Sequence, residues 1–142
     1  QGREQDTGEA DGDEGEAPIQ IAAKYAPNMI RFLVWNNADI ELPTRNGLTP
    51  LMLACTTEGK IIAIEHILGS GASLTTQSHS KSLPGTALHV ACNQNELQKA
   101  KLLLKKGANP NQKDLNGNPP LLQAMRLFSE DMLYLLLEFG AQ

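Results

Sequence analysis

Short apolar blocks recur along the chain at nearly constant intervals, separated by polar stretches rich in glycine, asparagine and proline. A shift of 33 residues places the block at 86–91 on the block at 119–124, and the leucine runs and Gly-Ala pairs that follow also coincide. The matching block lies 37 residues earlier, at 49–54, and another lies a further 32 residues back, at 17–22. Four units agree in order and nearly in spacing, which predicts a repeat architecture.

Each unit starts with a helix signal and ends in a turn. In the second unit Thr49 offers a hydroxyl for the helix N-cap, and Pro50 stands at the first helical position, where its missing N–H costs little. In the third unit an apolar stripe with spacing i, i+3, i+6, i+7 begins at Leu97 and predicts a second helix, which Gly107 ends. Helices of about 8–10 residues are marginal alone. Stacking must therefore supply the core, as in a solenoid.

Residues 17–142 resemble the ankyrin repeat family in several motifs. They are Gly-x-Thr-Pro-Leu at 47–51, Thr-Ala-Leu-His-x-Ala at 86–91, Leu-Leu-x-x-Gly-Ala-x-x-Asn at 103–111 and Asp-x-x-Gly at 114–117. The resemblance implies an all-α repeat solenoid of about four stacked helix-turn-helix units with β-hairpin-like finger loops. The units are expected at about 17–48, 49–85, 86–118 and 119–142, the last one incomplete.

Charge divides the chain into two parts. Residues 1–16 hold seven carboxylates against one arginine, a net charge of −6, and contain no Val, Ile, Leu or aromatic residue. They are predicted to form an acidic disordered tail or linker. The other 126 residues hold nine acids and eleven bases, a net charge of +2, which argues against binding to nucleic acid. The chain has no initial methionine, so we expect it to be a piece of a longer protein.

The cysteines and the apolar runs indicate an intracellular protein, in the cytoplasm, the nucleus or both. Cys55 and Cys92 fit a reducing compartment better than a disulfide scaffold. No apolar run approaches the ~18–20 residues that span a bilayer, so no membrane insertion is expected.

Candidate chemistry is sparse. His89 and Cys92 could form a nucleophile pair, but the resemblance gives His89 a hydrogen bond to backbone and places Cys92 in a small buried position shared with Cys55. His66, His79 and His89 have no neighbours at metal-ligand spacing. No glycine-rich loop that could hold phosphate occurs. We therefore expect no enzyme activity, no metal and no cofactor.

Three surface features have two possible interpretations each. The lysines of the third unit's outer helix are expected to form a solvated face, with an acidic or nucleic-acid contact as the alternative; they are Lys99, Lys101, Lys105 and Lys106. Trp35 is expected to face solvent, where it covers an edge or serves as a partner hot spot. The Ser/Thr-rich insertion at 75–82 is expected to be a tolerated loop whose hydroxyls could be modified.

The resemblance implies that a partner binds the finger tips and the exposed side of the inner helices, which form a concave groove. The groove candidates are Lys24, Tyr25, Arg45, Asn46, Leu48, Thr56, Thr57, Ser82, Leu83, Asn93, Gln94, Leu115, Asn116, Asn118, Arg126 and Leu127. They include three cations and no carboxylate, by chance or because the groove binds a neutral-to-acidic extended peptide. We therefore predict a non-catalytic protein–protein interaction module, an adaptor or recruitment domain. The alternatives are a regulatory ankyrin array of a larger enzyme or channel, and a purely structural stack.

Overall fold

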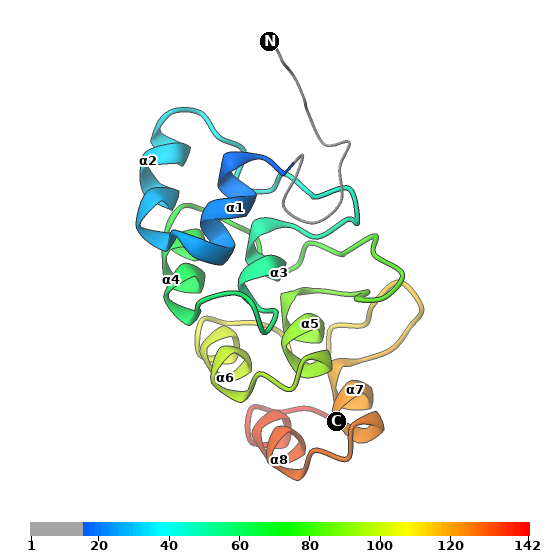
Figure 1. Ribbon diagram of the computed structural model, residues 1–142. Helices are drawn as coiled ribbons and strands as arrows, with labels where there is room; N and C mark the ends of the chain where they lie inside the picture. Colours follow the sequence, from blue (N-terminus) through cyan, green and yellow to red (C-terminus); the bar gives the residue numbers. More distant parts are fainter. Residues whose placement is uncertain (1–15) are drawn as a thin grey trace.

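The computed structural model describes residues 16–142 as a stack of helix pairs (Figure 1). In chain order the elements are α1 (Pro18–Tyr25), η1 (Pro27–Met29), α2 (Ile30–Trp35), α3 (Pro50–Ala54), α4 (Ile61–Gly69), α5 (Ala87–Asn93), α6 (Leu97–Lys105), α7 (Pro120–Arg126) and α8 (Glu130–Glu138). Residues 16–142 contain no strand, only an isolated bridge between Ser78 and Gly85. The predicted all-α repeat solenoid is confirmed. The predicted acidic tail, apart from Glu16, lies outside the described residues.

The helices form two layers. The inner layer consists of α1, α3, α5 and α7, each packed against the next, and the outer layer consists of α2, α4, α6 and α8 in the same order. Each inner helix also contacts the outer helix that follows it in the chain. Loops that precede α3, α5 and α7 project from the inner layer, to the right in Figure 1. We call them the first finger (43–48), the second finger (75–85) and the third finger (112–118).

Local signals at the helix ends work largely as predicted. The Thr49 hydroxyl accepts a hydrogen bond from the backbone N–H of Met52 at 3.4 Å, which caps α3. Gly107 ends the turn after α6 with a φ of +104°. In the first unit Asn37 occupies the corresponding place with a φ of +73°, a left-handed conformation that asparagine tolerates better than most residues. The first unit can therefore close its turn without the glycine.

His89 joins two backbone segments. Its Nδ1 accepts a hydrogen bond from the backbone N–H of Thr86 at 3.0 Å, so its Nε2 carries the proton and donates to the carbonyl oxygen of Asn118 at 2.8 Å. In the first unit the Gln20 amide makes a related pair of bonds: it accepts from the backbone N–H of Ala17 at 2.8 Å, as His89 does from Thr86, and it donates to the Leu42 carbonyl at 3.0 Å, six residues before the equivalent of Asn118. The predicted backbone hydrogen bond of His89 is thus confirmed, and the imidazole serves the fold.

His89 predicts a measurable loss of stability in acid. Burial lowers the pKa of His89, although the bond to Asn118 and the Asp114 carboxylate oppose this shift. The unfolded chain therefore takes up a proton near pH 6.5, at which the folded chain still has a neutral imidazole. We expect the free energy of unfolding, measured in urea between pH 8 and pH 5, to be constant above pH 7 and to fall below pH 6.5.

His89→Gln is the variant for this experiment, because Gln20 shows that an amide at the equivalent position can accept from the helix-cap N–H and donate to a backbone carbonyl. The variant should fold and should lose most of the pH dependence between pH 7 and pH 5.5. An equally steep loss in the variant would assign the acid sensitivity to other groups.

Both cysteines are free and buried at equivalent places in the stack. Burial raises the pKa of Cys92 to about 12, and burial also raises the pKa of Cys55 above its ordinary value. A protonated, buried thiol is a poor nucleophile. The Cys92–His89 pair therefore lacks the activated thiolate that covalent catalysis requires.

Lys99 departs from the predicted solvated face. Its side chain is only 6% exposed, and its ammonium group donates hydrogen bonds to the carbonyl oxygens of Thr56 at 2.5 Å and Gly59 at 2.7 Å. The Glu96 carboxylate lies 3.3 Å from the same nitrogen. Those two carbonyls belong to the turn between α3 and α4, so Lys99 links the third unit to the second. The remaining lysines of the predicted face are exposed, namely Lys101, Lys105 and Lys106.

The second finger is tied to the loops on either side of it. The Glu41 carboxylate accepts hydrogen bonds from the backbone N–H of Ser73 at 2.6 Å and from the Thr76 hydroxyl at 3.1 Å. On the other side, the Gln77 side-chain amide donates to the Lys113 carbonyl at 2.9 Å. The insertion is therefore held in place by both neighbours.

The first finger packs closely on the second. Gly47 has a φ of +88°, and a Cβ atom there would lie 2.9 Å from the backbone nitrogen of Ser80. Within the insertion the Ser78 hydroxyl accepts a hydrogen bond from that nitrogen, and both Ser78 and Ser80 are buried. Their burial leaves these two hydroxyls out of reach of a modifying enzyme, whereas Ser82 is exposed.

Candidate partner-binding surface

The predicted groove residues belong to the inner helices, to the fingers, which project to the right in Figure 1, and to the turns that follow the inner helices. Exposed candidates are Tyr25, Arg45, Asn46, Thr57, Ser82, Leu115, Asn116, Arg126 and Leu127. Half-buried candidates are Thr56, Leu83, Asn93, Gln94 and Asn118. Most of the predicted set is therefore accessible to a partner.

Two candidates are not available on this surface. Leu48 belongs to the hydrophobic core, because it follows the tip of the first finger where the chain turns inward toward α3. Lys24 is buried as well, and its ammonium group lies 3.1 Å from the Glu16 carboxylate and 5.3 Å from the centre of the Tyr25 ring. The predicted partner-binding role is corrected for both residues: Leu48 stabilises the fold, and the charge of Lys24 is balanced within the chain.

Polar side chains of three successive units are joined by hydrogen bonds. Gln94 Oε1 accepts from the backbone N–H and the hydroxyl of Thr57, at 3.4 and 3.5 Å. Gln94 Nε2 donates to Asn93 Oδ1 at 3.2 Å, and Asn93 Nδ2 donates to Gln123 Oε1 at 3.3 Å. We call Thr57, Gln94, Asn93 and Gln123 the polar row. A side-chain amide has two donor hydrogens and two acceptor lone pairs, so the row keeps capacity for a partner.

Sequence reasoning missed Gln123 as a member of the row. Gln123 stands three positions before Arg126 in α7 and is buried, and its equivalents Leu53 and Val90 are apolar core residues. A glutamine at a position that is apolar in the second and third units was the sequence signal that could have identified this residue.

The finger tips are held by side chains at their bases. Asp114 Oδ1 accepts hydrogen bonds from the backbone N–H groups of Asn116 and Asn118, both at 2.9 Å. In the first finger the Thr44 hydroxyl accepts from the backbone N–H of Leu48 at 3.2 Å. Asn118 is further held through its carbonyl by His89. The backbone groups of Asn118 thus position the finger, while the Asn116 side chain is presented to solvent.

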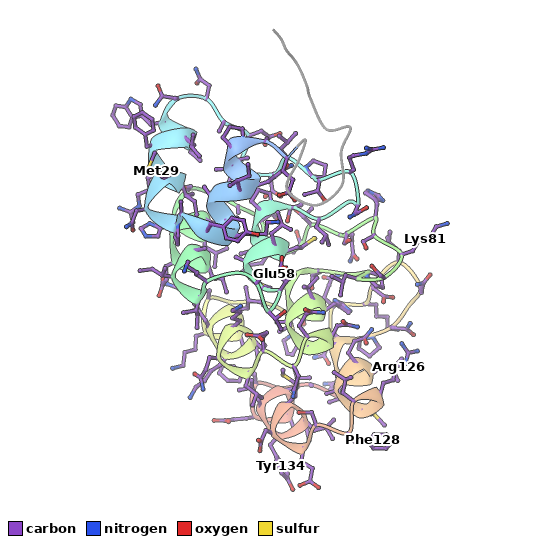
Figure 2. All side chains as sticks on the ribbon, in the orientation of Figure 1. Met29, Glu58, Lys81, Arg126, Phe128 and Tyr134 are labelled. Atoms are coloured by element: carbon purple, nitrogen blue, oxygen red, sulfur yellow. The ribbon has the colours of Figure 1, made fainter. Side chains whose placement is uncertain are left out.

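A cavity of about 330 Å³ lies between the second and third fingers. Lys81 and Asn116 line it together with Leu115, and all three side chains are exposed. Figure 2 shows Lys81 at the outer end of its finger and Arg126 beside α7. Lys81 was not among the predicted contacts, although the neighbouring Ser82 was.

The charge of this surface is mixed but mainly positive. Arg45, Lys81 and Arg126 are exposed, and the exposed carboxylate of Glu58 directly follows Thr57 of the polar row (Figure 2). Of the three predicted cations, Lys24 is paired with Glu16, and Lys81 adds an exposed cation that was not predicted.

Within residues 16–142, no group of three His, Cys, Asp or Glu side chains could hold a metal ion. Among the helices of the same residues, none has the length and apolar character to cross a bilayer.

The stacked helix pairs and their fingers define a class of repeat protein, and comparison with known families agrees. A family model described as ankyrin repeats in three copies matches residues 58–142, so the chain belongs to the ankyrin repeat family. Ankyrin repeats generally mediate protein–protein interaction, and the family is generally non-catalytic. The first helix pair lies outside the matched range, although α1 and α2 pack on α3 and α4 as the later pairs do.

Several known proteins are similar in sequence to this chain. The chain is 37% identical over 111 residues to Inversin of Mus musculus, an alignment that covers 78% of this chain and 10% of that protein. It is 33% identical over 129 residues to the B-cell lymphoma 3 protein homolog of Mus musculus, covering 89% of this chain and 29% of that protein. It is 33% identical over 131 residues to the transient receptor potential cation channel subfamily A member 1 of Homo sapiens, covering 92% of this chain and 11% of the channel. The chain thus spans a small part of each relative.

Proposed function

We propose that this array is a non-catalytic adaptor or recruitment module that binds an extended, neutral-to-acidic segment of a protein partner on its fingers and inner helices. The polar row carries the proposal, because it joins polar side chains of three successive units and includes the half-buried amides of Asn93 and Gln94, held by the buried Gln123. An extended peptide presents backbone N–H and C=O groups at regular intervals, and amides can pair with both.

The positions of the cations support the acidic preference. Arg45 stands on the first finger and Arg126 at the end of α7, so they flank the polar row. Lys81 and Asn116 border the cavity between the second and third fingers, where a carboxylate of the partner would find a cation and an amide. Complementary charge of this kind sets specificity and association rate more than affinity. The two buried free thiols support the proposed intracellular location, in the cytoplasm, the nucleus or both.

Charge reversal on the fingers and α7 tests this proposal. In affinity capture from cell lysate with quantitative mass spectrometry, Arg45→Glu/Arg126→Glu should retain about tenfold less of the specific partner than the unchanged chain, since two exposed contacts are worth about 1–2 kcal/mol. Arg31→Glu/Lys60→Glu is the matched control, because it makes the same change in charge at exposed residues of the outer helices and their caps. Equal losses in both variants, or in neither, would contradict the proposed surface.

A second candidate is that the array regulates a larger enzyme or channel. Its similarity to part of a cation channel favours this reading, because the alignment covers 92% of this chain and 11% of the channel. Sequencing the complete transcript would decide: a catalytic or membrane-spanning region in the same open reading frame supports the regulatory role, and its absence supports the adaptor.

A further inference from the structure

The outer helices α4, α6 and α8 carry different chemistry at equivalent places. Each is nine residues long, so their positions correspond one to one. The second position holds Ile62 in α4, Gln98 in α6 and Asp131 in α8. Ile61 and Ile62 are 42% and 51% exposed, although these are positions at which the last unit places two carboxylates. Two exposed isoleucines side by side leave apolar surface in water that nothing in the fold requires.

The isoleucines border a cavity with a basic edge. The cavity, of about 400 Å³, lies between α4 and α6, and its apolar lining includes Ile61, Ile62 and Leu102. Lys101 and Lys105 also line it, one helical turn apart. Both lysines are exposed, and no carboxylate within residues 16–142 forms an ion pair with either of them.

The carboxylate in the cavity lining already has an ion-pair partner. Glu65 lies in α4, and its carboxylate is 3.0 Å from the ammonium group of Lys106. The cavity therefore presents an apolar floor with two available positive charges. It fits an exposed aromatic or aliphatic side chain that has carboxylates one turn away on either side.

Helix α8 carries such a set of side chains. Tyr134 is 68% exposed, and Glu130 and Glu138 stand one turn before and one turn after it. Asp131 adds a third exposed carboxylate on this helix, and Figure 2 shows Tyr134 at the end of the stack. Glu130 and Glu138 stand four residues before and four residues after Tyr134, and Lys101 and Lys105 stand four residues apart beside the cavity. The acidic helix and the basic cavity are therefore complementary in charge and apolar content.

We propose that the outer layer is an interface for a second copy of this chain, in which Tyr134 of each copy enters the α4/α6 cavity of the other. Within one copy the basic cavity and α8 lie on opposite sides of α6 in the outer layer (Figure 1). A two-fold axis near α6 therefore places α8 of one copy over α4 and α6 of the other, and makes the reciprocal contact at the same time. Such an isologous arrangement closes as a dimer and leaves no free binding surface for further copies.

The size of the surface sets the expected strength. Three helices of nine residues, each about 14 Å long and about 8–10 Å apart, give a face of roughly 14 by 30 Å. A face of this size, roughly 400 Å² on each copy, is smaller than a standard specific interface and typical of weak contacts, so we expect dissociation constants of about 10–500 μM. The inner helices and fingers remain free in the dimer. The interface is thus additional to the proposed partner-binding surface.

A charge exchange between two variants tests the reciprocal dimer. In sedimentation equilibrium of the chain at 10 μM to 1 mM in low salt, the unchanged protein should show a monomer–dimer equilibrium that weakens as salt rises. Lys101→Glu/Lys105→Glu alone, and Glu130→Lys/Glu138→Lys alone, should each dimerise at least tenfold more weakly. An equimolar mixture of the two variants should recover the dimer, because both of its contacts again join opposite charges.

Lys81→Glu/Lys113→Glu is the matched control: it changes the same charge on the fingers and should dimerise like the unchanged chain. Circular dichroism and thermal unfolding show whether each variant is folded, and all substituted side chains are exposed. An unchanged chain that stays monomeric at 1 mM would overturn the proposal and leave the patch to a different protein or a lipid surface. A mixture no more associated than its components, or growth beyond a dimer, would overturn the reciprocal two-fold contact.

Discussion

Replacing Leu103 with alanine is expected to lower the free energy of unfolding by about 2–5 kcal/mol. Leu103 is fully buried in α6, which packs against α4, α5 and α8. The truncated side chain leaves a cavity in the core beside a helix that contacts the units on both sides of its own. Because each unit of a solenoid is stabilised by its neighbours, the loss should spread to the adjoining pairs and lower one cooperative transition.

Urea unfolding followed by circular dichroism at 222 nm measures this effect. Leu127→Ala is the control, because Leu127 is an exposed leucine outside the core, and it should change stability by less than about 0.5 kcal/mol. A loss below about 1 kcal/mol for Leu103→Ala would show that the helix pairs are not stacked as described.

Lys99→Met should destabilise the fold by about 2–4 kcal/mol. Methionine keeps an unbranched stem of similar length but cannot donate hydrogen bonds. The carbonyl oxygens of Thr56 and Gly59 then lose a charged donor, and the Glu96 carboxylate loses its partner. The contribution of Glu96 is the smaller part, because that side chain is more exposed than Lys99 and water screens it.

Lys101→Met separates this effect from the removal of a charge. Lys101 is exposed on the same helix, so its replacement should change the free energy of unfolding by less than about 0.5 kcal/mol. The two variants have equal net charge and composition, and chemical denaturation compares them directly. Equal stability of the two variants would mean that the link between the second and third units contributes nothing.

Much of this fold was predictable because its signals are local and occur four times. The N-cap at Thr49 and the turn at Gly107 depend on residues close in the chain, and the repeat makes each of them visible against its equivalents. The role of His89 was accessible through the family motif at 86–91. The match of Gln20 with His89 was not, because an amide and an imidazole look unrelated until both accept a hydrogen bond from the backbone N–H at the start of their helix.

What the repeats did not predict depends on contacts between units. Lys99 is buried because the turn between α3 and α4 leaves two carbonyls within its reach, which no pattern within α6 reveals. Leu48 and Lys24 were assigned to the surface by equivalence. In the structure Leu48 packs in the hydrophobic core, and Lys24 forms an ion pair with Glu16. Position in a repeat thus predicts the backbone well, and it predicts side-chain accessibility only where the neighbouring units are equivalent too.

The ties of the second finger affect how fast and how reversibly this surface can bind. Glu41 and Gln77 fix the finger to both of its neighbours, so its backbone has little freedom left to lose when a partner arrives. Association then needs no slow rearrangement of the loops and should approach the ~10⁵–10⁷ M⁻¹s⁻¹ typical of rigid docking. Differences in affinity among partners would therefore appear in how long each remains bound, a residence time determined by the side chains that the rigid fingers present.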